Sequence, residues 1–302
     1  MGIALGPNQY GKAENRVVRI YRDTDRHEIR DLNVSTSLRG EFSDAHITGE
    51  QGDVLPTDTQ KNTAFAFAKE KGVTSPEQFG LTLGAHFLDT APKATASRIG
   101  LEEFTWERIS VNGVEHDHSF VRRGPEVRTA VVTTDDSRGE RRQWVVSGIQ
   151  DLVVLKSTGS GFKGFLTDRY TTLQETEDRI MATAMTARWR YEHTNVEDWN
   201  ATFSDIKRIM LEVFASTYSK ALQQTLYMMG KAVLEAHEEV AEIRFSAPNK
   251  HHFVVDLSPF GVENNNEVFI AADRPYGLIE ASVVRDDGSD PGDAWLNTPG
   301  FC

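Results

Sequence analysis

The chain has 302 residues, enough for two domains of ordinary size, and its formal net charge of −12 argues against a nucleic-acid partner, because phosphate binding needs clustered Lys and Arg. It contains no run of about 18 apolar residues and no basic stretch followed by an apolar core near Met1, so we expect neither a membrane span nor a secretion signal, and a cytoplasmic location. The single cysteine, Cys302, excludes an intrachain disulfide and a zinc site built on several thiolates.

The first half of the chain predicts two strands, two helices and three further strands. A helix is expected to follow Thr57-Asp58 and to stop at Gly72. A second helix is expected to begin after Ser75, where Ser-Pro-Glu-Gln combines an N-cap, a proline at the first helical position and a capping-box Gln78. The expected strands, in which β-branched residues are interleaved with polar ones, span residues 14–22, 27–40, 97–110, 128–134 and 141–157.

The second half predicts the same order of elements. It opens with a long strand over residues 179–193, whose apolar face carries Met181, Met185, Trp189 and Tyr191. Apolar residues at helical spacing then predict helices over 202–216 and 220–237. The remaining strands are expected at 240–247, 250–257, 267–272 and 277–284.

This order of elements predicts an α+β fold, in which long antiparallel strands carry helix pairs on one sheet face. We expect two similar units, residues 1–142 and 143–285, although sequence identity between them is weak. Residues 286–302 form an acidic, turn-rich tail, whose order we expect to depend on a neighbouring subunit. Closing several such sheets into a ring would remove their exposed edges.

Residues 152–179 contain the most informative motif of the chain. They begin as an apolar strand, pass through a glycine-rich turn that presents Phe162, and end on Arg179. A flat aromatic ring and a planar guanidinium in one pocket suit a flat, anionic heterocycle, because arginine offers two parallel donors at fixed geometry.

The chain resembles the urate oxidase (uricase) family through five motifs, which lie at residues 9–12 (QYGK), 57–63 (TDTQKNT), 162–179, 222–227 (LQQTLY) and 248–253 (PNKHHF). The resemblance implies oxidation of urate by O2 to 5-hydroxyisourate and hydrogen peroxide, without metal or organic cofactor. It also implies two tandem T-fold (tunnelling fold) units per chain, in a homotetramer whose subunits form a barrel-walled tunnel and share their active sites.

The resemblance further implies how the substrate is held. Arg179 matches the family arginine that forms paired hydrogen bonds with one edge of the purine, Gln223 matches the glutamine on the opposite edge, and Phe162 matches the ring that stacks on its face. Backbone N–H groups matching Leu222 and Asp58 also bind urate in the family. Both residues are predicted near helix starts, and Ser219 is the expected N-cap of the helix over residues 220–237. Backbone N–H groups at helix starts favour anionic ligand atoms.

The same resemblance assigns proton handling to Lys12, Thr57 and His251, which match the catalytic relay of the family. A lysine removed from water can act as a base near neutral pH, a threonine hydroxyl both donates and accepts, and histidine titrates in this range. Asn249 matches the amide that holds oxygen, water or peroxide above the ring. In the family, residues matching Lys12, Thr57 and Asp58 come from one subunit and the others from its neighbour.

Two other functions stay open at this point. One is a T-fold hydrolase acting on a purine or pterin, although such enzymes use a zinc ligated partly by cysteine. The other is a purine-binding scaffold without turnover, which would not need a proton relay. Residues 115–118 (Glu-His-Asp-His) could suggest a metal cluster, but they follow the turn signal Asn112-Gly113 and are interpreted as a solvated turn.

Overall fold

A computed structural model describes residues 2–296, so Cys302 and the last part of the predicted tail lie outside the described residues. The chain divides into two compact units. The first comprises residues up to Gly148, Arg190–Ala201 and the described residues from Ser289 on, and the second comprises Ile149–Trp189 and Thr202–Gly288. These compact units differ in kind from the two similar units expected over residues 1–142 and 143–285, and that expected repeat stays a prediction.

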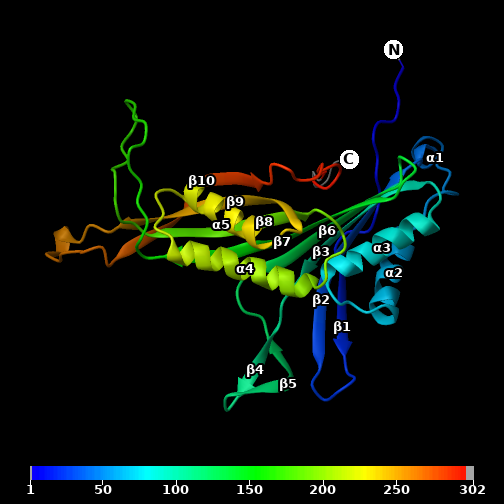
Figure 1. Ribbon diagram of the computed structural model, residues 1–302, viewed down its shortest axis with the longest axis horizontal. Coiled ribbons are helices and arrows are strands. Elements are labelled where there is room, and N and C mark those ends of the chain that lie inside the picture. The colour runs from blue at the N-terminus through cyan, green and yellow to red at the C-terminus, as the bar shows by residue number, and fades with distance from the viewer. Residues whose placement is uncertain (1, 297–302) are drawn as a thin grey trace. The chain divides into compact units, whose positions relative to one another are not determined.

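The first unit is an antiparallel sheet covered by helices (Figure 1). Its strand order is β1-β2-β3-β6-β7, and β7 continues into the second unit. Helix α3 packs on β3 and β6, and helix α2 packs on β1. The elements are β1 (Asn15–Tyr21), β2 (Glu28–Gly40), α1 (Ser43–Ile47), α2 (Thr57–Glu70), α3 (Pro76–Thr90), β3 (Ala94–Glu103), β4 (Glu107–Val111), β5 (Val114–Val121), β6 (Val127–Asp135) and β7 (Arg142–Lys156).

The core of the first unit lies between the helices and one face of the sheet. In β2, every second residue from Leu32 to Leu38 is buried, as expected for a strand with one covered face. Helix α3 approaches the sheet closely at Gly80, where an added Cβ would lie 2.7 Å from a Val132 methyl. Its start is capped as predicted, since the Ser75 hydroxyl accepts the Gln78 N–H at 3.1 Å.

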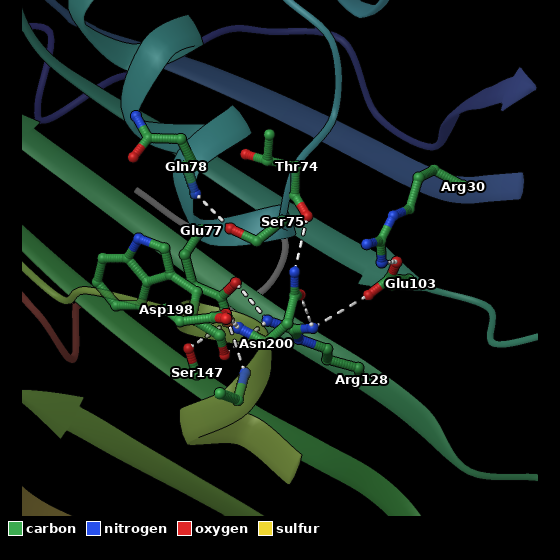
Figure 2. Close-up of polar contacts among 12 residues, drawn as sticks. Arg30, Thr74, Ser75, Glu77, Gln78, Glu103, Arg128, Ser147, Asp198 and Asn200 are labelled. Carbon is green, nitrogen blue, oxygen red and sulfur yellow. Dashed lines mark hydrogen bonds and ion pairs between the residues drawn. The ribbon is translucent and has the colours of Figure 1, made fainter. Parts of the chain in front are cut away.

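A buried charged network holds the start of α3 in place (Figure 2). Glu77, which is fully buried, accepts hydrogen bonds from Arg128 Nη2 at 2.7 Å and from the Ser147 hydroxyl at 2.6 Å. Arg128 Nη1 also donates to Asn200 Oδ1 at 2.7 Å and forms an ion pair with Glu103 at 3.4 Å. Because these residues come from different elements of the unit, their satisfied charges fix the mutual positions of those elements.

The second unit has the strand order β7-β8-β9-β10, with α5 packed on β9 and β10. The apolar face predicted for the strand that is β8 is confirmed, because Met181, Met185, Trp189 and Tyr191 are all buried. The remaining elements are β8 (Met181–Tyr191), α4 (Trp199–Ser216), α5 (Leu222–Ala236), β9 (Val240–Val254), the 3₁₀ turn η1 (Ser258–Phe260) and β10 (Phe269–Val284). The α+β class is therefore confirmed.

Three predictions about the strands are wrong. The expected strand over 97–110 is two strands, β3 and β4, separated by residues 104–106. The four strands expected between residues 240 and 284 are two long ones, β9 and β10. Residues 115–118 lie in β5 and not in a turn, because the two-residue turn at Asn112-Gly113, with φ of 53° and 81°, leads directly into a paired strand.

Two findings concern metal binding and membrane insertion. Within residues 2–296, no group of three or more His, Cys, Asp or Glu side chains is arranged to hold a metal ion. In the same range, no helix combines the length and the apolar character needed to cross a bilayer.

Candidate functional site

The N-terminal motif lies along β2 as a short additional strand segment. Tyr10 and Leu38 exchange two backbone hydrogen bonds, of 3.1 and 2.8 Å. Thr36 N–H donates to the Lys12 carbonyl at 2.8 Å. Between them, Gly11 lies so close to β2 that an added Cβ would be 1.8 Å from the Thr36 carbonyl oxygen. The glycine of this motif is therefore required by backbone contact, and it brings the half-buried Lys12 to a fixed place beside the sheet.

The start of α2 lies next to Lys12. Thr57 and Asp58 stand at its start, as predicted, although the helix includes them and does not follow them. Its first backbone bond runs from Gln60 N–H to the Pro56 carbonyl at 3.1 Å. The N–H of Asp58 thus has no intrahelical partner and is available to an anionic ligand atom. Hydrogen bonding to Lys61 lowers the pKa of the Asp58 carboxyl, and the charge of Lys12 lowers it further.

In the second unit, backbone hydrogen bonds join three chain segments into what we call the loop frame, made of residues 159–162, 176–179 and 219–222. Ser219 N–H donates to the Gly159 carbonyl at 2.9 Å, and Gly161 N–H donates to the Ser219 carbonyl at 2.8 Å. Phe162 and Thr176 exchange bonds of 2.7 and 3.0 Å. The frame therefore sets the positions of Phe162 and of the start of α5 without using their side chains.

Arg179 is attached to the same frame, because its N–H donates to the Ser160 carbonyl at 2.8 Å. Its guanidinium carbon lies 5.1 Å from the centre of the Phe162 ring. Burial lowers the pKa of Arg179, although an arginine stays charged at any physiological pH. The buried Nε of Arg179 has no hydrogen-bond partner in the described part of the chain.

The ring of Phe162 has a neighbour that the sequence did not predict. Phe165 stacks on it, with 5.0 Å between ring centroids and 14° between ring planes. Since a nearly parallel ring covers one aromatic face, a flat ligand has only the opposite face of Phe162 for stacking while Phe165 stays in this position.

The start of α5 differs in detail from the prediction. Leu222 is its first residue, but the N-cap is Ala221, in extended conformation and without a capping side chain. Ser219, the expected N-cap, uses its hydroxyl to accept from Thr225 at 2.7 Å and to donate to the Ala221 carbonyl at 3.0 Å. The N–H of Leu222 still lies in the first turn, and the neighbouring side chain of Gln223 is exposed.

Asn249 and His251 are placed by β9. They lie two positions apart and hence on the same strand face, opposite Gly277 and Ala272 of β10, and both are partly buried. The β9–β10 register shifts between Ala272 and Gly277, directly beside these two residues. The ring of His251 lies 5.9 Å from that of Phe253, at an interplanar angle of 29°.

The predicted site residues therefore form two groups, one in each unit. Lys12, Thr57 and Asp58 gather in the first unit. The loop frame joins Phe162, Arg179 and Leu222 in the second, which also contains Gln223, Asn249 and His251. The sequence interpretation gave no role to Gln60, although it stands inside the TDTQKNT motif, nor to Thr36, which no motif contains.

Comparison with known proteins shows the family of this chain. The Uricase family profile matches residues 8–133 and 145–280. The chain is 52% identical over 300 residues to a uricase of Arthrobacter globiformis, covering 99% of this chain and 96% of that protein. It is 40% identical over 281 residues to a uricase of Dictyostelium discoideum, covering 92% and 96%.

Solved structures give the same result. A crystal structure of the Arthrobacter globiformis uricase matches with a TM-score of 0.92 at 52% identity and covers 98% of this chain and 100% of that one. A uricase from Bacillus fastidious, 24% identical, matches with a TM-score of 0.80 over 93% and 94% of the two chains, which shows a shared fold. With the family profile matched over most of its length, this chain belongs to the uricase family.

Proposed function

We propose that this protein is a urate oxidase, which converts urate, O2 and water to 5-hydroxyisourate and hydrogen peroxide. The observation that carries this proposal is the 52% identity to the Arthrobacter globiformis uricase over nearly the full length of both chains. The reaction balances without a further reagent, because urate loses two electrons to O2, which becomes H2O2, and water supplies the hydroxyl group of the product. We propose that no metal or organic cofactor takes part and that O2 is the co-substrate.

Arg179, Gln223 and Phe162 are the proposed substrate clamp. The guanidinium carbon of Arg179 lies 5.1 Å from the Phe162 ring centre, and this placement of the cation beside the ring supports the role. A purine lying against Phe162 would bring its oxygen and nitrogen acceptors within reach of the guanidinium, and Gln223 would pair with the other edge. The first-turn N–H groups of Leu222 and Asp58 are proposed to hold the remaining oxygens.

The proposed proton relay consists of Lys12, Thr57 and His251. Lys12 lies close enough to the first turn of α2 for its charge to lower the pKa of Asp58, which supports cooperation with Thr57. In this relay, Lys12 takes the proton that the Thr57 hydroxyl receives from urate or water, and His251 exchanges a proton at the opposite end. Asn249 is proposed to hold O2, water or peroxide above the purine ring.

We also propose a homotetramer with shared active sites, in which Lys12, Thr57 and Asp58 of one subunit complete a site with the other residues of its neighbour. The proposal follows the resemblance to the family, in which the matching residues come from two subunits; in this chain the same two sets lie in different units. It predicts that dilution to monomers abolishes turnover, and it would be wrong if monomers kept full specific activity. A cytoplasmic location stays a prediction.

The function is tested with metal-stripped protein in an oxygen electrode, with urate absorbance and peroxide followed in parallel. We expect one O2 consumed and one peroxide formed per urate, without added metal. Turnover that requires zinc or consumes no O2 would favour a hydrolase instead, and urate that binds without being consumed would favour a scaffold.

A further inference from the structure

A chain of buried hydrogen bonds runs from α2 to the N-terminal motif. The side chain of Gln60, in the first turn of α2, is fully buried. Its amide nitrogen donates to the Leu55 carbonyl at 3.2 Å, and its amide oxygen accepts the Thr36 hydroxyl at 2.6 Å. The same Thr36 oxygen accepts the Lys12 N–H at 3.1 Å. Two side chains therefore connect the helix that carries Thr57 to the backbone of Lys12.

The geometry of this connection is strict because every polar atom in it is used. The Thr36 hydroxyl has one proton to give, which goes to Gln60, and a lone pair that receives the Lys12 N–H. Thr36 is itself 7% exposed, so water cannot readily replace either bond. An apolar side chain at position 60 would fill similar space, but it would leave the Thr36 hydroxyl and the Leu55 carbonyl without this partner.

The connection acts on a residue that lies between two strand pairings. Lys12 stands between the bridge of Tyr10 to Leu38 and β1, which begins at Asn15, and its own N–H bonds to β2 through the Thr36 hydroxyl. Residues near a chain terminus keep one position when they are bonded to the fold in this way. A proton relay needs donor and acceptor within hydrogen-bond reach, and a displacement of about 1 Å can cost on the order of 100-fold in rate.

We propose that Gln60 and Thr36 are positioning residues for the reaction, which hold Lys12 at the distance from Thr57 that proton transfer requires. This inference rests on the proposed function of Lys12 and Thr57. Neither Gln60 nor Thr36 needs to touch urate, since both act through the backbone of Lys12 and the first turn of α2.

The test compares Thr36→Val, which removes the hydroxyl at nearly constant volume, with Thr36→Ser, which keeps it. We expect Thr36→Val to lower kcat by about tenfold or more, while the Kd of a non-reacting urate analogue stays within about threefold, because the substrate clamp is unaffected. Thr36→Ser should restore most of kcat. Gln60→Met removes both hydrogen bonds of the side-chain amide and should behave like Thr36→Val. It provides a second test if the valine variant fails to fold.

The matched control is Thr82→Val on α3, where the partly exposed hydroxyl donates within its own helix, to the Gln78 carbonyl. The inference is overturned if Thr36→Val and Gln60→Met keep kcat within about twofold of the wild type. It is also overturned if they lose kcat and analogue binding to the same extent, or if Thr36→Ser is as impaired as Thr36→Val. The variant Lys12→Met distinguishes failure of the proposed relay from failure of the positioning role. If Lys12→Met keeps wild-type turnover, Lys12 has no part in the relay. If Lys12→Met loses turnover while Thr36→Val keeps it, the relay stands and only the positioning role of Thr36 is wrong.

Discussion

Replacing Gly11 by alanine tests whether the place of Lys12 beside β2 matters for turnover. The added Cβ would lie 1.8 Å from the Thr36 carbonyl oxygen, whereas real Cβ atoms essentially never approach closer than 3.0 Å. The N-terminal segment must therefore move by at least 3.0 − 1.8 = 1.2 Å, because the obstacle is backbone of a paired strand.

The movement breaks or weakens four hydrogen bonds between residues 10–12 and β2, three between backbone groups and one to the Thr36 hydroxyl. At about 0.5–1.5 kcal/mol each, their loss releases the segment at a cost of about 2–6 kcal/mol, which is local and need not unfold the rest of the unit. Since the displacement exceeds about 1 Å, kcat should fall on the order of 100-fold.

Two measurements check this result. Oxygen uptake gives kcat, and amide hydrogen exchange should show faster exchange at Thr36 and Leu38, whose N–H groups bond to the segment. Gly6→Ala is the matched control, because a Cβ at Gly6 meets nothing within 4 Å. Wild-type kcat together with unchanged exchange in Gly11→Ala would refute the reasoning.

Three further predictions concern the clamp, the relay and the fold. Arg179→Ala should weaken binding of a urate analogue by about 100-fold or more, because two charge-assisted bonds of about 1.5–3 kcal/mol each are lost; calorimetry that finds near-normal affinity would contradict the clamp. Thr57→Ala should lower kcat by on the order of 100-fold with little change in analogue binding, and unchanged turnover would remove Thr57 from the relay. Arg128→Met leaves the buried Glu77 and Glu103 without this partner and should lower the free energy of unfolding by about 3–5 kcal/mol. Denaturant titration at fixed protein concentration measures this loss, and a change below about 1 kcal/mol would mean that the network is not stabilising.

Most elements could be predicted because their signals are local. The hydroxyl of Ser75, the proline after it and the apolar spacing of α5 act within a few residues, and each predicted helix is present. The start of α4 was missed by three residues, although the signal was local too, since the Asp198 carboxylate accepts the N–H groups of Asn200 and Ala201.

The strand errors have non-local causes. The strands expected over 240–247 and 250–257 are one strand, β9, whose pairing with β10 continues through Pro248, opposite Leu278, and across the register shift between Ala272 and Gly277. Between β3 and β4, Phe104 N–H bonds to the Asp31 carbonyl and the Trp106 indole bonds to the Asp31 carboxylate. These contacts to another strand interrupt a pattern that looked continuous in sequence.

The identities of the candidate site residues could be taken from motifs, but the contacts that hold them could not. Ser219 looks like an N-cap because it precedes a helix, whereas its backbone is bonded to Gly159 and Gly161, and the helix starts three residues later, at Leu222. The role of Thr36 depends on a partner 24 residues away in the chain. Such pairings are set by the fold, so a motif can name Lys12 without revealing what positions it.

The loop frame has a practical consequence for protein engineering. Residues 163–175 leave and re-enter the frame at one paired position, Phe162 opposite Thr176, so the loop is closed at its stem. Extending a closed loop is inexpensive, at about 0.6 kcal/mol per doubling of its length. Peptide tags or affinity epitopes inserted near the exposed Leu166 should therefore be carried without displacing Arg179, which makes this loop a candidate site for display.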